Sequence, residues 1–416
     1  MPVLKNIATL YTCPPDGGQP DVGEITNAAM VWADGQIVWT GPEKDLPKIY
    51  DGYLAYDARG RMVIPGLIDC HTHLAFGGWR ADEFEMRSLG RSYLDIAKAG
   101  GGILSSVDAT RRADPEKLLE KSRVLITHIV KLGVTTIEAK TGYGLDLDTE
   151  LSVLRMYRQL NNMGLIDIIP TYLGAHTTPP EYSKDRRKYI RAIINTVLPM
   201  VNIEGSARFI DVFVEESAFT ADEARRILLA GMEFGLRAKI HADQLSACGG
   251  AELAAEVGAV SADHLERVTD QGIQRLSKTG VVAVSLPLAS FYLKQPPLPA
   301  RKLIDSGVPV AVATDFNPGS APSWHLPLAM TMACTMQSMS PAEVLKGATA
   351  YAARAISVDD TVGSLQPGKQ ADFAIIDAPD VNHWLYHFRP NACMATYKKG
   401  RALHDVSENE PVYPWY

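Results

Sequence analysis

The sequence has few cysteines, and none of them are spaced like a metal-binding or redox motif. The five cysteines are odd in number, lie far apart in the 416 residues and include no CxxC pair. Widely spaced, unmatched cysteines are typical of reduced thiols in a cytosolic protein. The five are Cys13, Cys70, Cys248, Cys334 and Cys393.

Long apolar runs and an excess of basic residues are also missing. No run reaches the ~18 apolar residues of a membrane helix. The stretch that comes closest, residues 280–293, contains Ser and Pro. Residues 1–5 lack the basic and apolar segments of a signal peptide. With 41 basic and 48 acidic residues the formal charge is −7, which argues against nucleic acid as a partner. We expect a cytoplasmic protein that binds neither nucleic acid nor membrane.

The two ends of the chain have the texture of short strands and turns. Residues 29–33 and 36–40 are rich in β-formers and flank Asp34-Gly35, which is a strong hairpin signal. Turn-and-strand texture returns at residues 363–368 and 371–376. We expect residues 1–62 and 357–416 to form one small composite β domain.

Between these ends, apolar strand-like runs alternate with helix-like segments, as in βα units. Several runs are apolar almost throughout, which suits parallel strands covered on both faces. Residues 63–356 are therefore expected to form an α/β domain. The predicted strands are 63–74, 135–140, 168–175, 210–215, 238–241, 259–264, 281–286 and 308–315, and the predicted helices include 115–132, 185–201, 221–234 and 341–356.

Two histidines at the end of the first predicted strand are candidate metal ligands. His71 and His73 are two residues apart, so on a strand both side chains face the same way. Two imidazoles on one side suit a single divalent cation. The alternative is a pair of histidines on a solvent-facing strand. Cys70, between them, faces the opposite side and is expected to pack in the core.

Three further strand-like runs end in a ligand-type residue. These ends are His241, His264 and Asp315. In a (β/α)₈ barrel the carboxyl ends of the strands meet at the catalytic face. Because chance packing does not explain four such endings well, the pattern predicts a metal-dependent enzyme.

These residues resemble the amidohydrolase superfamily. The resemblance is carried by Pro-Gly-Leu-Ile-Asp-Cys-His-Thr-His at 65–73, by the three later strand ends, and by Gly-x-Leu-x-Pro-Gly-Lys-x-Ala-Asp at 363–372. It implies a distorted TIM (β/α)₈ barrel with a small composite β-sandwich domain built from both termini. It also implies the metal ligands His71, His73, His241 and Asp315, with His264 beside the metal-bound water.

Five further motifs resemble the imidazolonepropionase family in particular. They are Phe-Gly-Gly-Trp-Arg at 76–80, Ala-Gly-Gly-Gly-Ile at 99–103, Lys-Thr-Gly-Tyr-Gly at 140–144, Leu-Gly-Ala-His at 173–176 and Asp-Phe-Asn-Pro-Gly-Ser at 315–320. The resemblance implies hydrolysis of 4-imidazolone-5-propanoate to N-formimidoyl-L-glutamate in histidine degradation. It also implies a homodimer.

The side-chain chemistry suits that substrate. Water activated by the cation attacks the ring carbonyl, Asp315 takes its proton, and His264 stabilises the oxyanion. Arg80 is a planar bidentate partner for the propanoate, the alternative being an exposed loop arginine. By resemblance, the residues that contact substrate or product are Tyr143, His176, Asn317, Gly319 and Ser320.

Gln244 separates this interpretation from its nearest rival. An amide stands three residues after His241, where many metal deaminases of the superfamily place a glutamate. Because an amide has no titratable proton, Gln244 is expected to orient the ring through hydrogen bonds. The rival function, a metal-dependent aminohydrolase of a nitrogen heterocycle, is weakened but remains open, as does a non-catalytic barrel without metal.

The number and kind of metal ions are less determined by the sequence. Lys140 would support two ions if it were carboxylated, with His176 and His241 at the second ion. Alternatively, Lys140 pairs with Glu138 on the same strand face, and we favour this mononuclear arrangement. Three histidines and an aspartate suit either Zn²⁺ or Fe²⁺.

Overall fold

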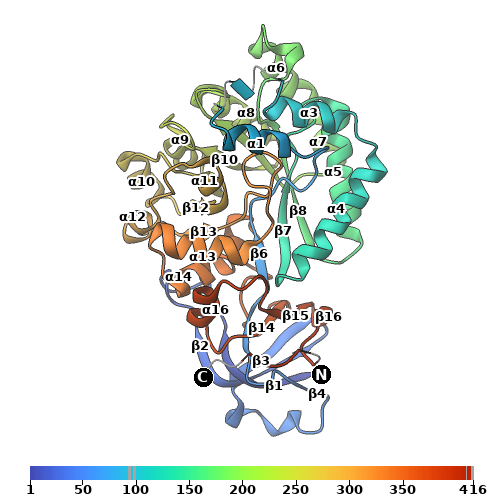
Figure 1. Ribbon diagram of the computed structural model, residues 1–416, viewed down its shortest axis with the longest axis vertical. Helices are drawn as coiled ribbons and strands as arrows, with labels where there is room; N and C mark the ends of the chain where they lie inside the picture. Colours follow the sequence, from blue (N-terminus) through green and yellow to red (C-terminus); the bar gives the residue numbers. More distant parts are fainter. Residues whose placement is uncertain (92–94, 97–99, 409, 414–416) are drawn as a thin grey trace.

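The computed structural model describes residues 1–91, 95–96, 100–408 and 410–413 and contains a parallel barrel and a second, mixed sheet (Figure 1). Eight parallel strands follow one another in sequence order, as βα units require. They are β6 (Leu67–Asp69), β7 (Val134–Lys140), β8 (Asp167–Ala175), β9 (Phe209–Val214), β10 (Arg237–Ala242), β11 (Ser261–His264), β12 (Val282–Ser285) and β13 (Val310–Val312). This is the expected TIM-barrel fold.

Helices flank the barrel strands (Figure 1). Helix α4 shows why: Asp114 caps its first turn, Pro115 occupies its first position, and its buried face carries Leu118, Leu125 and Ile129. The helices are α1 (Ala81–Ser88), α3 (Ile103–Arg111), α4 (Pro115–Val130), α5 (Leu147–Asn162), α6 (Arg186–Ala192), α7 (Leu198–Glu204), α8 (Ala221–Glu233), α9 (Gly250–Val257), α10 (Asp270–Leu276), α11 (Pro287–Leu293), α12 (Ala300–Asp305), α13 (Leu326–Gln337), α14 (Pro341–Gly347), α15 (Ala350–Ala355) and α16 (Val381–His387). Short helical turns are η1 (Glu43–Asp45), η2 (Lys48–Tyr50), η3 (Pro180–Tyr182) and the π-helical η4 (Ile193–Val197).

Two predicted helices are interrupted. Residues 185–201, expected as one helix, contain the π-helical turn Ile193–Val197 between α6 and α7. Residues 341–356 divide into α14 and α15 at Thr349, whose backbone is not helical (φ −130°, ψ −95°). The apolar periodicity continues across both interruptions, so it does not mark them.

The single strand expected at residues 63–74 is wrong. The segment splits at Gly66 into β5 (Met62–Pro65), which joins the second sheet, and β6 in the barrel. A Cβ at Gly66 would lie 2.3 Å from the hydroxyl of Thr135, so the strand change needs glycine. Both halves are apolar, and hydrophobicity alone does not assign them to different sheets.

The first and last barrel strands, β6 and β13, are connected just beyond their regular ends, and this connection, the barrel joint, closes the barrel. Thr72 forms a parallel bridge with Phe316. The Asp315 amide donates to the His71 carbonyl (3.1 Å), and the His73 amide donates to the Phe316 carbonyl (2.8 Å). The segment that carries the two histidines is therefore hydrogen-bonded to the segment that carries Asp315.

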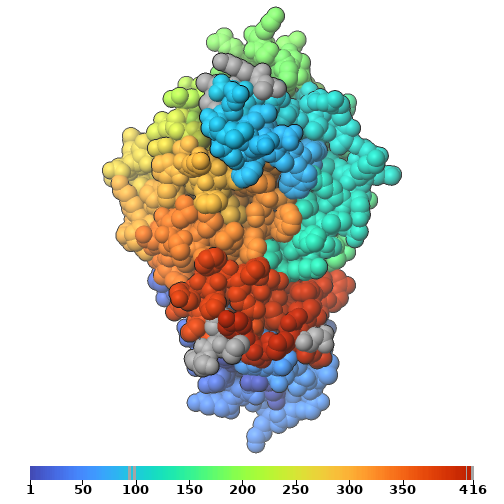
Figure 2. Space-filling model, in the orientation of Figure 1, coloured from blue at the N-terminus to red at the C-terminus, as the bar shows by residue number. Residues whose placement is uncertain are grey.

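The second sheet combines both ends of the chain. Its order is β16-β15-β14-β5-β1-β2-β3, with β4 paired to β1. Figure 2 shows the blue N-terminal and red C-terminal segments together at one end of the molecule. The strands are β1 (Val3–Tyr11), β2 (Glu24–Ala33), β3 (Gln36–Pro42), β4 (Ala55–Asp57), β5, β14 (Phe373–Ile376), β15 (Cys393–Lys398) and β16 (Arg401–Asp405). The predicted hairpin at Asp34-Gly35 joins β2 and β3 and is confirmed.

This sheet curls around its own core. Trp32 on β2 and Phe373 on β14 are three strand spacings apart, about 14 Å in a flat sheet. Their ring centroids are nevertheless only 5.3 Å apart, and Tyr397 stacks on Phe373 at 4.4 Å. The Trp32 indole N–H also donates to the Gly400 carbonyl (3.2 Å). The half of the sheet that contains β2 and the half that contains β14 and β15 are the two wings of the sheet. They therefore face each other, as in the expected sandwich.

Ala99, the first residue of the glycine-rich motif at 99–103, lies outside the described residues. Among the residues that are described, no helix is long and apolar enough to cross a membrane.

We expect Trp32→Ala to destabilise the composite sheet. Trp32 is 3 % exposed and joins the two wings, so its truncation removes a large apolar contact and leaves a cavity. The expected loss is about 3–5 kcal/mol of unfolding free energy. It is measured by thermal and denaturant unfolding. Ile49→Ala, at a side chain 73 % exposed, is the control and should change little. Equal midpoints for the two variants would contradict the proposed role of Trp32.

Candidate active site

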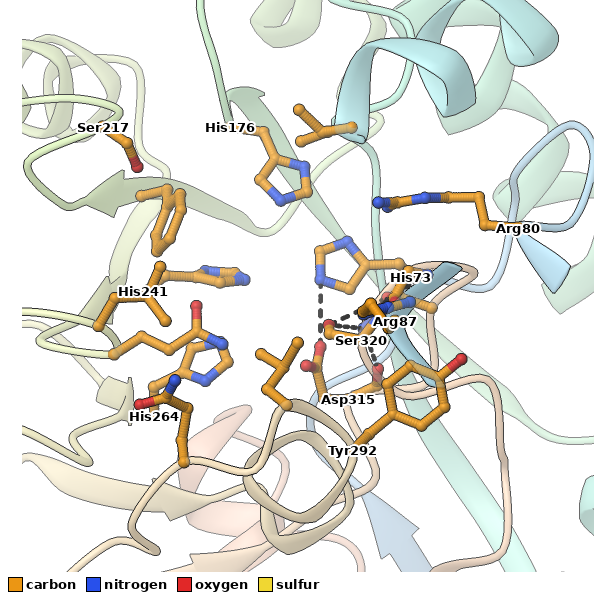
Figure 3. Close-up of a pocket in the computed structure, with 18 of the residues that line it drawn as sticks. His73, Arg80, Arg87, His176, Ser217, His241, His264, Tyr292, Asp315 and Ser320 are labelled. Atoms are coloured by element: carbon orange, nitrogen blue, oxygen red, sulfur yellow. Dashed lines mark hydrogen bonds and ion pairs between the residues drawn. The ribbon is translucent and has the colours of Figure 1, made fainter. Parts of the chain in front are cut away.

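A cavity of about 600 Å³ lies at the carboxyl ends of the barrel strands (Figure 3). This is the face on which barrel enzymes place their catalytic groups. Of the site residues predicted from the sequence, eleven line the cavity: His73, Arg80, Tyr143, His176, His241, Gln244, His264, Asp315, Asn317, Gly319 and Ser320. The twelfth, His71, lies beneath them and is fully buried.

His71 and His73 follow β6 rather than lying on it. Strand β6 ends at Asp69, and the Thr72 bridge to Phe316 keeps the next residues extended. The two rings consequently lie on one side, with centroids 5.4 Å apart. The expected common side is confirmed, although regular strand geometry is not what produces it. His241 comes from β10, and its ring centroid is 4.5 Å from that of His71.

Asp315 completes this group from the other side of the barrel joint. One carboxylate oxygen, Oδ1, is 3.4 Å from His71 Nε2 and 3.6 Å from His73 Nε2. Asp315 has a left-handed backbone (φ 56°). Its neighbour Thr314 is held by Asp69, which accepts hydrogen bonds from the Thr314 amide (3.0 Å) and hydroxyl (2.5 Å).

The ring nitrogens of these histidines suit a divalent cation. His71 Nδ1 is 2.7 Å from Asp263 Oδ2, which leaves Nε2 directed at the group. Neither His71 Nε2 nor His241 Nε2 has a hydrogen-bond partner in the described part of the chain. Burial is the main reason that the pKa values of His71, His73 and His241 lie well below the usual range. The three imidazoles are therefore neutral, which is the form that binds metal.

His264 differs electrostatically from the other histidines. Burial acts to lower its pKa, but the carboxylates of Glu266 and Asp315 outweigh burial and raise it. Glu266 Oε2 is 3.7 Å from His264 Nδ1. Ser290 donates to the other oxygen of Glu266 (2.9 Å) and holds the carboxylate in place. His264 is thus better suited to donating a hydrogen bond than to coordinating a cation.

A fully buried ion network lies below the histidines. Lys140 Nζ contacts Glu138 (3.0 Å), Asp211 (2.7 Å) and Asp263 (3.4 Å). The expected pair with Glu138 is therefore present and is part of a larger network. Lys239 adds a second ammonium, 3.1 Å from Glu138.

The surroundings of Lys140 favour an ammonium ion. Although burial opposes it, Asp211, Glu138 and Asp263 raise the pKa of Lys140. A carboxylated lysine would place a fourth negative group among these three carboxylates. The geometry therefore favours the structural ion pair over a bridging ligand for two metals.

The loop that carries Tyr143 is held by a buried carboxylate. Glu150 accepts hydrogen bonds from the amides of Gly144 (2.8 Å) and Leu145 (2.8 Å). The carbonyl of Gly142 in the same loop is 3.1 Å from His176 Nδ1. Tyr143 and His176 thereby come beside His73, at ring distances of 5.7 Å and 5.1 Å.

Arg80 enters the cavity with one edge of its guanidinium already paired. Its Nε and Nη2 donate to the two oxygens of Glu83, at 2.9 Å and 2.6 Å. The remaining nitrogen, Nη1, lies against Gly319, where an added Cβ would come within 2.0 Å. Asn317 shapes this loop, because its Oδ1 accepts from the amides of Gly319 (2.8 Å) and Ser320 (2.7 Å).

Several residues at the site were not identified from the sequence. Arg87 lines the cavity seven residues after Arg80, at the spacing of one helix face, and this signal could have indicated it. Glu83 lies among other charged residues in the first turn of α1, so the sequence did not distinguish it from a surface residue. Asp211 is a single acid in the apolar strand β9, a pattern that could have suggested a buried ion pair.

Comparison with known proteins agrees with this geometry. The model of the amidohydrolase family matches residues 62–403. The imidazolonepropionase of Geobacillus kaustophilus is 46 % identical over 387 residues, 92 % of this chain and 91 % of that protein. The imidazolonepropionase of Shewanella putrefaciens is 44 % identical over 398 residues, 95 % of this chain and 97 % of that protein.

Solved structures share the fold at low sequence identity. Escherichia coli guanine deaminase has a TM-score of 0.75 and 14 % identity, covering 97 % of this chain and 98 % of its own. The atrazine chlorohydrolase of Arthrobacter aurescens, solved with zinc, has a TM-score of 0.75 and 15 % identity, covering 98 % of this chain and 96 % of its own. The chain belongs to the amidohydrolase family, whose members are metal-dependent, and within that family it groups with the imidazolonepropionases.

Proposed function

We propose that this protein is an imidazolonepropionase, which hydrolyses the cyclic amide of 4-imidazolone-5-propanoate to N-formimidoyl-L-glutamate. The observation that carries the proposal is the 46 % identity to a protein of that name over 92 % of the chain. The cavity supports it, because neutral histidines and a carboxylate meet there with an arginine suited to the propanoate.

We propose that one divalent cation, Zn²⁺ or Fe²⁺, is held by His71, His73, His241 and Asp315. The neutral imidazoles and the two unpartnered Nε2 atoms fit such an ion. A divalent cation bound there supplies Lewis acidity and lowers the pKa of water at this position.

Three side chains around the proposed cation site have different roles in the hydrolysis. Asp315 is placed to accept the proton of the attacking water, since its carboxylate faces the histidine group, and to return that proton to the ring nitrogen when the C–N bond breaks. His264, which Glu266 favours in its charged form, donates a hydrogen bond to the oxyanion that forms when water adds to the ring carbonyl. Gln244 lines the same cavity and orients the ring, because an amide has no proton to transfer.

Substrate contacts come from loops around the cavity. Arg80 offers Nη1 to the propanoate, while Glu83 holds the opposite edge. Tyr143 and His176 bound the ring pocket next to His73. Asn317, Gly319 and Ser320 form the loop that contacts substrate or product.

We also propose that the protein is a cytoplasmic homodimer. All five cysteines are free thiols, which suits a reducing compartment. The dimer is the expectation for the family, and light scattering of the purified protein tests it.

Chelation tests the enzyme assignment directly. We expect purified protein to consume 4-imidazolone-5-propanoate, followed by loss of its ultraviolet absorbance. A chelator should reduce the rate to below about 1 %, because a Lewis acid contributes several kcal/mol to such a transition state. Added Zn²⁺ or Fe²⁺ should restore it. Full activity in metal-free protein would exclude the metal mechanism, and no turnover by loaded protein would exclude the substrate.

Arg80→Ala should weaken substrate binding more than turnover. A charge-assisted hydrogen bond to the propanoate contributes about 1.5–3 kcal/mol, so KM should rise about 10- to 100-fold. The value of kcat should change less than KM, because the propanoate is remote from the bond that breaks. Arg123→Ala removes the same charge from the outer face of α4 and is the control. An unchanged KM in Arg80→Ala would remove Arg80 from the substrate site.

Asp263→Asn should weaken metal binding. Asp263 contacts His71 Nδ1 and so keeps Nε2 directed at the cation. Loss of such an outer carboxylate typically costs about 10- to 100-fold in metal affinity. Competition with a chelating dye measures it. Asp270→Asn makes the same change at a side chain 86 % exposed and should bind metal normally. Equal affinities would show that Asp263 does not orient His71.

A further inference from the structure

The cavity carries a charge opposite to that of the chain. The whole sequence has a formal charge of −7. Among the described side chains that line the cavity, four are cationic, namely Arg80, Arg87, Arg91 and Lys294, whereas Asp315 alone is acidic. A cleft lined by one sign of charge concentrates ligands of the other sign. The cavity is therefore suited to anionic ligands.

Arg80 does not by itself account for this preference. Its guanidinium forms a two-point ion pair with Glu83, and both oxygens of that carboxylate are used. Glu83 also accepts a hydrogen bond from the Gly102 amide (2.8 Å), and Arg80 helps to keep the pKa of Glu83 below its usual value despite burial. The Arg80–Glu83 pair is thus formally neutral before a substrate arrives.

Among the described residues Arg87, like Arg91 and Lys294, forms no ion pair with a carboxylate, and it is the one of these three that bonds to Gly319. Its Nη2 donates to the Gly319 carbonyl (2.9 Å), and its Nε donates to the backbone carbonyl of Glu83 (3.4 Å). The guanidinium carbon lies 4.8 Å from the ring centroid of Tyr292. Two carbonyls and a ring hold the group in place, and none of them is a carboxylate, although Arg87 also attracts the Glu83 carboxylate at longer range.

Arg80 and Arg87 converge on one glycine. Arg80 Nη1 packs against the position where a Gly319 side chain would begin, and Arg87 bonds to the carbonyl of the same residue. Figure 3 shows both arginines among the side chains that surround the cavity. A carboxylate has two oxygens with about four acceptor positions, so it can accept hydrogen bonds from two guanidinium groups at once.

We propose that Arg87 is a second carboxylate-binding residue, which shares the substrate's propanoate with Arg80 at Gly319. This inference rests on the proposed function. Arg80 supplies directed hydrogen bonds, but its ion pair with Glu83 offsets its positive charge. Arg87 supplies a positive charge that no such ion pair offsets. Glycine at 319 leaves room for both groups.

The test compares Arg87→Ala and Arg87→Lys with wild type in the metal-loaded enzyme. In Arg87→Ala we expect KM for 4-imidazolone-5-propanoate to rise about 10- to 100-fold, with kcat within about threefold. Arg87→Lys keeps the charge and should recover part of the loss. The dependence of kcat/KM on ionic strength should be weaker in Arg87→Ala than in wild type. Arg123→Ala is the control for net charge.

Two binding probes separate recognition from a structural effect. Calorimetry with 3-(imidazol-4-yl)propanoate should show the same loss of affinity in Arg87→Ala as KM does. Binding of 4-propylimidazole, which has no charge on its chain, should stay within about twofold of wild type, because only the anion meets Arg87. Equal losses for both probes, or an unchanged KM, would overturn the role of Arg87. Failure of the wild type to consume 4-imidazolone-5-propanoate would instead overturn the proposed function.

Discussion

The site depends on a balance of buried charges below the histidines. Glu138, Asp211 and Asp263 face the ammonium groups of Lys140 and Lys239, and all five side chains are excluded from solvent. Three carboxylates against two ammonium ions leave a formal charge of −1. Such groups are costly to bury unless they are paired, so each constrains its neighbours. The excess negative charge lies directly beneath the place where a cation would bind.

This network connects the strands to the chemistry above them. Asp263 contacts His71 at Nδ1, and Asp211 lies 2.9 Å from His241 Nδ1 and accepts from the backbone amide of the same histidine (3.1 Å). Asp263 therefore determines which nitrogen of His71 faces the other histidines, whereas Asp211 holds His241 through its backbone amide. The barrel joint at Thr72 then brings the two histidines of the β6 segment to Asp315. Metal site and barrel closure are parts of one hydrogen-bonded structure.

Substrate recognition is built differently, on loops held by single carboxylates. Glu150 organises the backbone around Tyr143, and Glu83 organises Arg80. Each acid accepts several hydrogen bonds, so a loop is kept in one conformation without becoming part of the barrel. Under the proposed function, this division keeps the cation ligands on the barrel and assigns recognition of the anion to the loops.

The sequence by itself determined the parallel barrel, the composite β domain and the residue types that could hold a metal ion. The barrel follows from apolar runs that alternate with helical segments, the β domain from strand-and-turn texture at both ends, and the candidate ligands from strand ends together with the family resemblance. It did not determine that residues 63–74 change sheets at Gly66, or that Lys140 contacts three acids. Only the tertiary structure decided these points, because the contacts join distant residues: Lys140 and Asp263 are 123 positions apart. The spacing from Arg80 could have placed Arg87 at the cavity, but its bond to the Gly319 carbonyl, 232 positions away, needed the tertiary structure.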